Sequence, residues 1–525
     1  MKLRLAAAAL LACASFTTAA PVFANTLRWA AQNDIQTLDP HSQNHSATST
    51  ITGYAYEGLT RYTEKFEVEP ALATKWTYIT PTQLRFDLRK GVKFHDGTPF
   101  TADDVVFSLQ RIKHPASNMA IYASGIKEVK KIDDNTVDFI LEGPNPVIAR
   151  NLTYVRIMSK AWSVKNKGEN PQDFKAKEDT YASRNAMGTG PFKITSWTPD
   201  QKITMVANKD WWDKPKGNIT EVSYLPIKSD ATRVAALLSG DLDLLTDLPP
   251  QDVAKLKADP RLKVIDGPEN RTIFFVLDEG SDEIKGSSVK GKNPFKDKRV
   301  REAMSLAIDR EAIKRSLMRG LSVPAAIMVA PVAYGWSQEL DVVAKPDVTR
   351  AKQLMTEAGY PDGFETPLAC PNDRYVNDEE ICQAVVSMWA RIGIKAKLTT
   401  QPMTQHSAAM QRFELPLYMY GWGVTTFDAQ YTLQDIVHTK TPGIDGKGNY
   451  GKISDAKVDA LVQQMKVETD VPKRLALMQE ALKRTRDEFL LIPIHHQVRP
   501  WAMKAGVTIP HSANDAPQAK WATVK

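Results

Sequence analysis

An arginine and an aspartate in the last third of the chain carry the charges that could hold the two ends of a small zwitterion. Arg374 has a planar guanidinium that can donate to both oxygens of a carboxylate. Asp428 offers the carboxylate that an ammonium group requires. Enclosing either end of a zwitterion without a counter-charge would cost several kcal/mol. Arg374 and Asp428 are therefore candidate ligand contacts, and the alternative for each is a surface charge or a salt bridge between domains.

The segment that contains both residues is predicted to alternate between strands and helices. Strands are predicted over 364–370, 395–400 and 415–420, and helices over 378–392 and 404–413. Arg374 then follows the first strand and Asp428 the last. Open α/β sheets bind ligands at this carboxyl edge of their strands, so we expect both residues at one ligand-binding edge.

Three further side chains near these positions are candidates for the wall of a binding cavity. Tyr375 and Asn377 follow Arg374 in the same loop, and Trp422 precedes Asp428. Aromatic walls with a few polar groups are typical of ligand pockets. Trp422 fits either a pocket wall or a core position. The loop 37–50, rich in hydroxyl and amide side chains, is either a second ligand-facing wall or a solvated loop.

Cys370 and Cys382 flank the predicted Arg374 loop. In an oxidising compartment they form either a disulfide or a pair of buried free thiols. A disulfide would tie the loop to the following helix and contribute about 3 kcal/mol in the chain-entropy model. Two cysteines do not have the spacing of a metal site, and His41 and His45 lie in a segment without helical periodicity. We therefore predict no metal site.

Composition and motifs argue against several other functions. The chain contains no Gly-x-Ser-x-Gly, His-Glu-x-x-His, phosphate-binding loop or dinucleotide fingerprint, so we predict neither an enzyme nor a bound cofactor. The formal net charge is +7 over 525 residues, and no basic tract with interleaved aromatic residues is present. Nucleic-acid binding is therefore not expected.

The first 24 residues have the pattern of a secretory signal peptide. Lys2 and Arg4 precede an apolar stretch, and small residues before Asn25 predict cleavage after Ala24. An alternative is a lipoprotein signal that would acylate Cys13. Cleavage after Ala24 would leave 525 − 24 = 501 residues, which is more than one ordinary domain, with a net charge of 7 − 2 = +5. The mature protein is predicted to be soluble and exported.

The run Asn293 to Arg310 is the most specific sequence signal. Asp297 is placed to cap a helix with an apolar stripe, and Asp309 to cap a second helix that ends before Gly320. The run closely resembles the signature of the family 5 extracellular solute-binding proteins, the dipeptide, oligopeptide and nickel receptors of bacterial ABC importers. Further landmarks of this family follow in the expected order: Leu38-Asp39-Pro40, Tyr56 to Leu59, Gly97 to Val105, Gly188 to Phe192 and Asn208 to Trp212.

This resemblance implies an α/β fold of the two-lobed periplasmic-binding-protein clamp with an extra α+β domain, type II and cluster C-like. The implied first lobe is discontinuous, with parts at 25–60, 186–270 and 491–525. The extra domain would span 61–185 and the second lobe 271–490. The alternation of helices and strands after residue 293 independently indicates an α/β domain with a largely parallel sheet.

The resemblance also implies a function. In the dipeptide receptors an Arg in the loop after this strand binds the ligand carboxylate, and an Asp after Gly-Trp binds the amine; Arg374 and Asp428 match these positions. The run 426–430 departs from the Gly-Asp-Pro-Asp that is usual in peptide receptors.

We expect a monomeric periplasmic receptor that delivers a short peptide to inner-membrane ABC permease subunits. Alternatives are a nickel complex, haem, an opine or an oligosaccharide as ligand, a secreted peptide or glycan hydrolase, or a chaperone.

Overall fold

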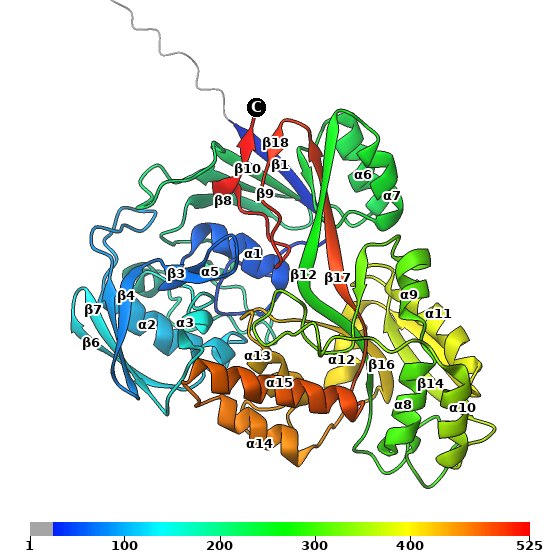
Figure 1. Ribbon diagram of the computed structural model, residues 1–525. Helices are drawn as coiled ribbons and strands as arrows, with labels where there is room; N and C mark the ends of the chain where they lie inside the picture. Colours follow the sequence, from blue (N-terminus) through cyan, green and yellow to red (C-terminus); the bar gives the residue numbers. More distant parts are fainter. Residues whose placement is uncertain (1–24) are drawn as a thin grey trace, which may run out of the picture.

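The computed structural model describes residues 25–525, so the predicted signal peptide and Cys13 lie outside the described residues. Two lobes are joined by a pair of long strands, β12 (Leu262–Leu277) and β17 (Ile492–Lys504), and a third domain lies beside them (Figure 1). Both long strands belong to one large sheet with the order β15-β14-β16-β12-β17-β11-β1-β10-β9-β8. The sheet therefore runs continuously from one lobe into the other.

The first lobe is built on the β11-β1-β10-β9-β8 side of this sheet. Its strands are β1 (Thr26–Ala31), β8 (Phe192–Thr198), β9 (Lys202–Ala207), β10 (Glu221–Pro226) and β11 (Leu244–Leu245). Its helices are α1 (Ser46–Ala55), α6 (Asp230–Ser239) and α7 (Pro250–Lys257), and the C-terminal tail adds β18 (Val507–Thr508), η5 (Ala519–Trp521) and β19 (Thr523–Val524). Trp29, Tyr224 and Trp501 are buried in its core. Side chains from both ends of the chain thus fill one core.

The second lobe is built on the β15-β14-β16 side. Its strands are β13 (Ser322–Pro324), β14 (Phe364–Pro371), β15 (Ile394–Gln401) and β16 (Leu417–Gly423). Its helical segments are η2 (Pro294–Lys296), α8 (Lys298–Leu306), α9 (Arg310–Ala312), η3 (Ile313–Leu317), α10 (Val348–Glu357), α11 (Asp378–Ala390), α12 (Met403–Gln411), α13 (Ala429–Thr432), η4 (Leu433–Val437), α14 (Ala456–Met465) and α15 (Val471–Asp487). β14 pairs in parallel with β15 and β16, whereas β12 and β17 are antiparallel. The expected parallel sheet is thus limited to three strands.

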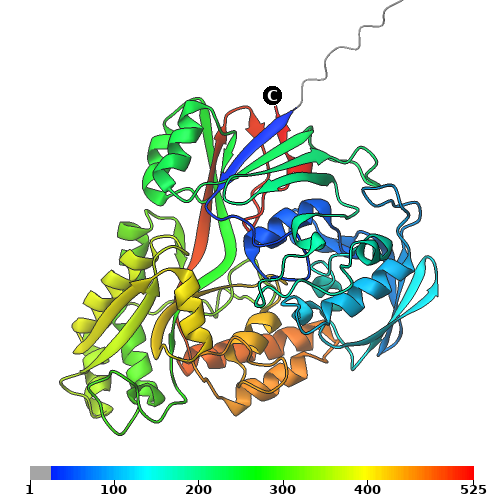
Figure 2. The same ribbon diagram turned by 180° about the vertical axis from the view of Figure 1, so that it is seen from behind.

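The extra domain is an antiparallel sheet of order β4-β5-β7-β6 covered by α2 (Ala102–Ile112). Its strands are β2 (Thr60–Tyr62), β3 (Val68–Pro70), β4 (Ala73–Thr80), β5 (Gln83–Leu88), β6 (Ile126–Asp133) and β7 (Thr136–Leu141), and its short helices are η1 (Ala120–Ala123), α3 (Ile148–Asn151), α4 (Lys160–Lys165) and α5 (Tyr181–Arg184). Seen from behind, the orange helices α14 and α15 lie between this domain and the yellow-green part of the second lobe (Figure 2).

The two connecting strands change partners at a bulge. The register between β12 and β17 is interrupted between Pro268 and Thr272. On one side of the break β17 pairs with β11, and on the other side β12 pairs with β16. A bulge bends a strand and increases its twist, so we propose residues 269–271 as the boundary between the lobes.

The capping pattern of the signature run is confirmed. The Asp297 carboxylate accepts a hydrogen bond from the Arg299 amide at 2.9 Å, and the Asp309 carboxylate accepts one from the Ala312 amide at 2.8 Å. Val300, Ala303 and Met304 are buried against the second-lobe sheet. Helix α11 begins at Asp378, where the helix 378–392 was predicted to begin, and Asn377 before it lies in the left-handed region at φ 53°.

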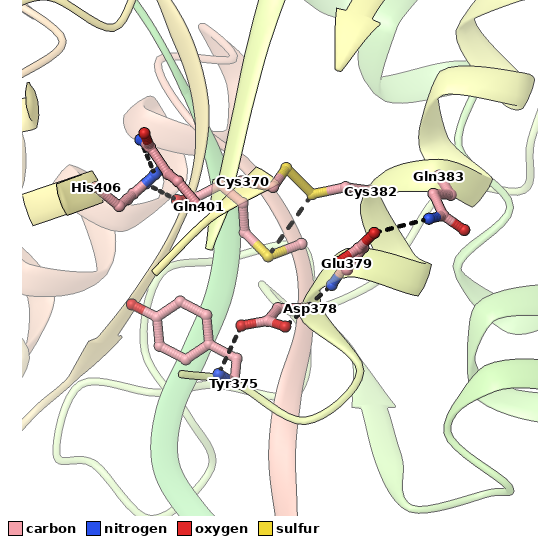
Figure 3. The surroundings of a disulfide bond; sticks show 9 residues. Cys370, Tyr375, Asp378, Glu379, Cys382, Gln383, Gln401 and His406 are labelled. Atoms are coloured by element: carbon pink, nitrogen blue, oxygen red, sulfur yellow. Dashed lines mark hydrogen bonds between the residues drawn. A yellow bond between two sulfur atoms is a disulfide. The ribbon is translucent and has the colours of Figure 1, made fainter. Parts of the chain in front are cut away.

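Cys370 and Cys382 form a disulfide between the end of β14 and helix α11 (Figure 3). Both cysteines are fully buried. The bond closes the loop that contains Arg374.

No helix within residues 25–525 is long and apolar enough to cross a membrane.

Candidate functional site

A cavity of about 620 Å³ lies between the lobes, a volume within the range of small-molecule sites. Its walls come from the first lobe, the extra domain and the second lobe together. Polar and aromatic groups alternate along these walls, and the lining side chains include Asn44, His45, Ser49, Glu57, Arg61, Tyr62, Tyr154, Arg156, Arg271, Arg374, Tyr375, Trp422 and Lys520. The loop 37–50 and the start of α1 therefore face the cavity with Asn44, His45, Ser46, Ser49 and Thr50.

Arg374 lies in the cavity wall just beyond the carboxyl end of β14. The Asp378 carboxylate accepts a hydrogen bond from the Tyr375 amide at 3.0 Å (Figure 3). It accepts another from the Arg374 amide at 3.0 Å, and the two bonds fold the loop back on the helix. Within residues 25–525 the Arg374 guanidinium has no hydrogen-bond or salt-bridge partner. Burial and the nearby charge of Arg271 lower the pKa of Arg374. The site therefore offers a half-buried guanidinium with no directly bonded partner, although its charge helps to lower the pKa of the nearby Glu269 and Asp247 carboxylates.

Tyr375 and Trp422 also line this cavity. The Tyr375 hydroxyl accepts from the Gly421 amide at 2.9 Å and donates to the Gly421 carbonyl at 3.2 Å. Both bonds join the Arg374 loop to β16, so Tyr375 positions its neighbour. Trp422 stacks on Tyr431 with ring centroids 5.2 Å apart. Its indole Nε1 is buried and has no hydrogen-bond partner in the described part of the chain.

Asp428 and Asn377 do not line this cavity. The Asp428 carboxylate is 1% exposed and accepts two hydrogen bonds from the Arg474 guanidinium, both at 2.8 Å. It borders a separate cavity of about 280 Å³. The Asn377 amide donates to the Leu317 carbonyl at 2.8 Å and ties the Arg374 loop to the segment after α9. This geometry does not favour ligand contacts for either residue, because their polar groups already have protein partners.

Sequence reasoning missed a group of charged residues beside the site, around a smaller cavity of about 70 Å³ that Arg271 and Arg374 also line. The Glu269 carboxylate pairs with Arg271 at 2.9 Å, and Arg499 pairs with Asp515 at 2.9 Å and also with Asp247. These residues come from the bulge of β12, from β17, from the segment after β11 and from the C-terminal tail. No local pattern marks them, because pairing of β12 with β17 brings them together.

Comparison with known proteins identifies the fold and the family. Residues 67–443 match the model of the bacterial extracellular solute-binding proteins, family 5 Middle, which is well over half of the chain. This chain belongs to that family. The chain is 28% identical to the Heme-binding protein A of Haemophilus influenzae over 461 residues, covering 82% of this chain and 79% of that one. It is 27% identical to the Dipeptide-binding protein of Escherichia coli strain K12 over 512 residues, with coverages of 92% and 91%.

A solved relative has the same two-lobed architecture. The periplasmic binding protein DppA of Helicobacter pylori, in complex with the peptide STSA, superposes with a TM-score of 0.80 at 23% identity and covers 95% of this chain and 98% of that one. The chain is thus a family 5 solute-binding protein with the two-lobed type II α/β fold, as the sequence indicated.

In this solute-binding protein the two sides of the cavity are in contact. The Tyr62 hydroxyl donates to the Thr426 carbonyl at 2.9 Å, and the hydroxyls of Tyr122 and Thr425 lie 2.9 Å apart. Phe66 stacks on Phe427 with centroids 4.0 Å apart. These bonds join the extra-domain side to the loop after β16. The two sides therefore touch beside the cavity, as expected for a closed clamp.

The described residues contain no group of three or more His, Cys, Asp or Glu side chains that could hold a metal ion. His41, His45 and His406 each have a lowered pKa, to about 3, 4 and 4, chiefly because burial disfavours the charged ring. The nearby charge of Arg374 also lowers the pKa of His45. Arg374 of the second lobe and His45 both line the cavity.

Proposed function

We propose that this protein is the periplasmic receptor of an ABC importer, which encloses a small carboxylate-bearing solute and delivers it to inner-membrane permease subunits. The observation that supports this best is the Arg374 guanidinium, which lines the inter-lobe cavity and has no hydrogen-bond or salt-bridge partner within residues 25–525. A half-buried cation without a counter-ion is costly in an empty site and favourable once an anion occupies it.

The ligand carboxylate would bind the Arg374 fork, with the Trp422 ring as part of the cavity wall. Lobe closure and ligand affinity are then linked, since the ligand contacts both walls only in the closed form. A short peptide is a natural ligand class because relatives include a dipeptide-binding protein and a receptor solved with a peptide. Another relative is named for haem, so the family alone does not select the ligand.

We further propose that residues 1–24 are removed on export after Ala24, and that the mature protein acts as a monomer. Two lobes of one chain enclose the cavity, so no second copy is required to complete it. No enzymatic step is proposed: the relatives compared above are binding proteins, and the receptor should release its ligand chemically unchanged.

Mass spectrometry of the small molecules released on denaturing protein purified from the periplasm would identify the ligand. The refolded, empty receptor should rebind that compound, and small-angle scattering should then report a smaller radius of gyration. The compound should be recovered with its original mass after prolonged incubation. A cleaved compound would indicate the hydrolase alternative instead. Scattering that stays constant while a ligand saturates the protein would contradict the closing clamp.

A further inference from the structure

The residues that line the cavity include more cationic than anionic side chains. Its lining residues include the cations Arg61, Arg156, Arg271, Arg374 and Lys520, but only the carboxylates of Glu57 and Asp373. Arg61 and Arg271 are neutralised by salt bridges from outside the lining set. Arg156, Arg374 and Lys520 have no salt bridge or side-chain hydrogen bond in the described part of the chain. Three cationic side chains of the cavity wall therefore have no directly bonded anion within the described residues.

The two lining carboxylates are poor partners for a ligand ammonium. The Glu57 carboxylate is buried and accepts hydrogen bonds from Thr189 at 2.9 Å and from the indoles of Trp211 and Trp212 at 3.2 and 2.8 Å. Burial also raises its pKa. Asp373 is exposed and accepts a bond from the Met403 amide at 2.7 Å. Asp428, the predicted ammonium partner, is paired with Arg474 outside the cavity.

Arg156 holds a fixed place on the wall opposite Arg374. Its carbonyl accepts a hydrogen bond from His41 at 2.8 Å, and its guanidinium lies against α1, where a methyl group added at Gly53 would be 3.0 Å from Nη2. The ring of Tyr154 lies 5.9 Å from the guanidinium carbon. The group is thus positioned by packing, while its donors are left free. An arginine retained only for structure would be expected to bond to a carbonyl or carboxylate.

The two free guanidinium groups lie at opposite ends of α1. Arg374 lines a small cavity together with Ser46, Ala47 and Thr50 in the N-terminal half of the helix, and Arg156 contacts Gly53 near its C-terminal end. Eight residues of helix correspond to about 12 Å along the axis, roughly the span of three extended residues. An elongated ligand along α1 would therefore meet a cation at each end.

We infer that the ligand of this receptor is an elongated dianion, with one carboxylate at Arg374 and a second anionic group at Arg156, and not a simple zwitterion. This inference rests on the proposed receptor function and narrows its ligand class. Lys520, in the C-terminal tail on the same side as Glu57, adds a third cation that favours negative charge in the cavity.

Four probes of different charge test the inference by isothermal titration calorimetry on the mature protein. They are Ala-Ala-Ala, a zwitterion; acetyl-Ala-Ala-Ala, a monoanion; succinyl-Ala-Ala-Ala, a dianion; and octanedioate, a dianion without peptide bonds. The succinyl peptide should bind at least about tenfold more tightly than the acetyl peptide, the effect expected of one added charge-assisted contact. Binding of octanedioate would point to a non-peptide dicarboxylate, and its absence to an acidic or acylated peptide.

Two variants test whether Arg156 binds the second anionic group of the ligand. Arg156→Gln should abolish the preference for succinyl over acetyl peptide and leave affinity for the acetyl peptide nearly unchanged, whereas Arg374→Gln should weaken both. Arg150→Gln is the matched control, because Arg150 lies on α3 in the same part of the chain but does not line the cavity. Circular dichroism and melting curves would verify folding.

The inference is overturned by tightest binding of the zwitterion, by a succinyl preference that survives Arg156→Gln, or by no binding of either dianion. None of these outcomes contradicts the receptor function, provided that the protein still closes when it binds the compound with which it co-purifies.

Discussion

The loops after β14 and β16 occupy equivalent places at the edge of one sheet, yet they use their charges differently. The Arg374 loop presents a guanidinium without a partner to the cavity. The Asp428 loop buries its carboxylate against Arg474 and offers Thr425, Thr426 and Phe427 to the opposite side of the cavity. We propose that the first loop binds the ligand and the second holds the closed form. A free charge signals binding only when no protein group satisfies it.

The strongest test of this contrast is the stability of an Asp428→Ala variant. Removing the carboxylate leaves the buried Arg474 unpaired, which should lower the free energy of unfolding by about 3–5 kcal/mol. Urea denaturation monitored by circular dichroism measures this loss. Replacing both partners together, as Asp428→Leu with Arg474→Met, should recover much of the stability. Ligand affinity per folded molecule should change only a few-fold. Loss of all binding would indicate that Asp428 contacts the ligand after all.

Arg374→Ala should give the opposite result. Affinity for a carboxylate ligand should fall by about 100-fold or more, because the ligand carboxylate would be enclosed without its counter-charge. The melting temperature of the empty protein should stay the same or rise slightly, since the side chain has no protein partner to lose. Calorimetric titration and thermal melting measure the two quantities. Undiminished affinity would remove Arg374 from the ligand site.

Phe427→Ala tests the proposed role of the Asp428 loop in closure. Phe427 is 1% exposed, stacks on Phe66 and does not line the cavity, so the change leaves the cavity walls intact. Loss of the stack should destabilise the closed form and weaken ligand binding by about tenfold. Scattering of the unliganded variant should report a larger radius of gyration. Phe427→Leu, which keeps apolar contact, is the control and should show a smaller effect.

The pH dependence of binding should be the smallest effect. Burial lowers the pKa of Lys520 to about 8, aided by the positive charge of Arg61 and opposed by Glu57 and Asp213. Lys520 therefore loses its charge as the pH rises through about 8. A bound anion favours the charged form, so affinity should fall three- to tenfold between about pH 7 and pH 9. Titrations across this range should show the decline in the native protein and its absence in Lys520→Met.

Much of the fold was accessible from local sequence. The Asp297 and Asp309 caps and the strand–helix order around Arg374 followed from periodicity and capping, and the structure reproduces them. The domain limits remain proposals, although the bulge at 269–271 lies at the expected junction. Of the site residues predicted from the sequence, three line the cavity: Arg374, Tyr375 and Trp422.

The Asp428–Arg474 pair could not be predicted from the sequence, because the two residues lie on different elements and no local pattern links them. Arg156 and Lys520 were missed for a related reason. They lie far from the recognised motifs and reach the cavity only through packing of the extra domain and the tail.

The amino-acid sequence by itself determined the helices, the strands and the family, because capping and apolar periodicity act over a few neighbouring residues. Tertiary structure decided which charges remain unpaired, since that depends on groups brought together from distant segments. Arg374 and Asp428 were equivalent candidates in the sequence. Only the folded chain gave Asp428 a buried partner and left Arg374 free for a ligand.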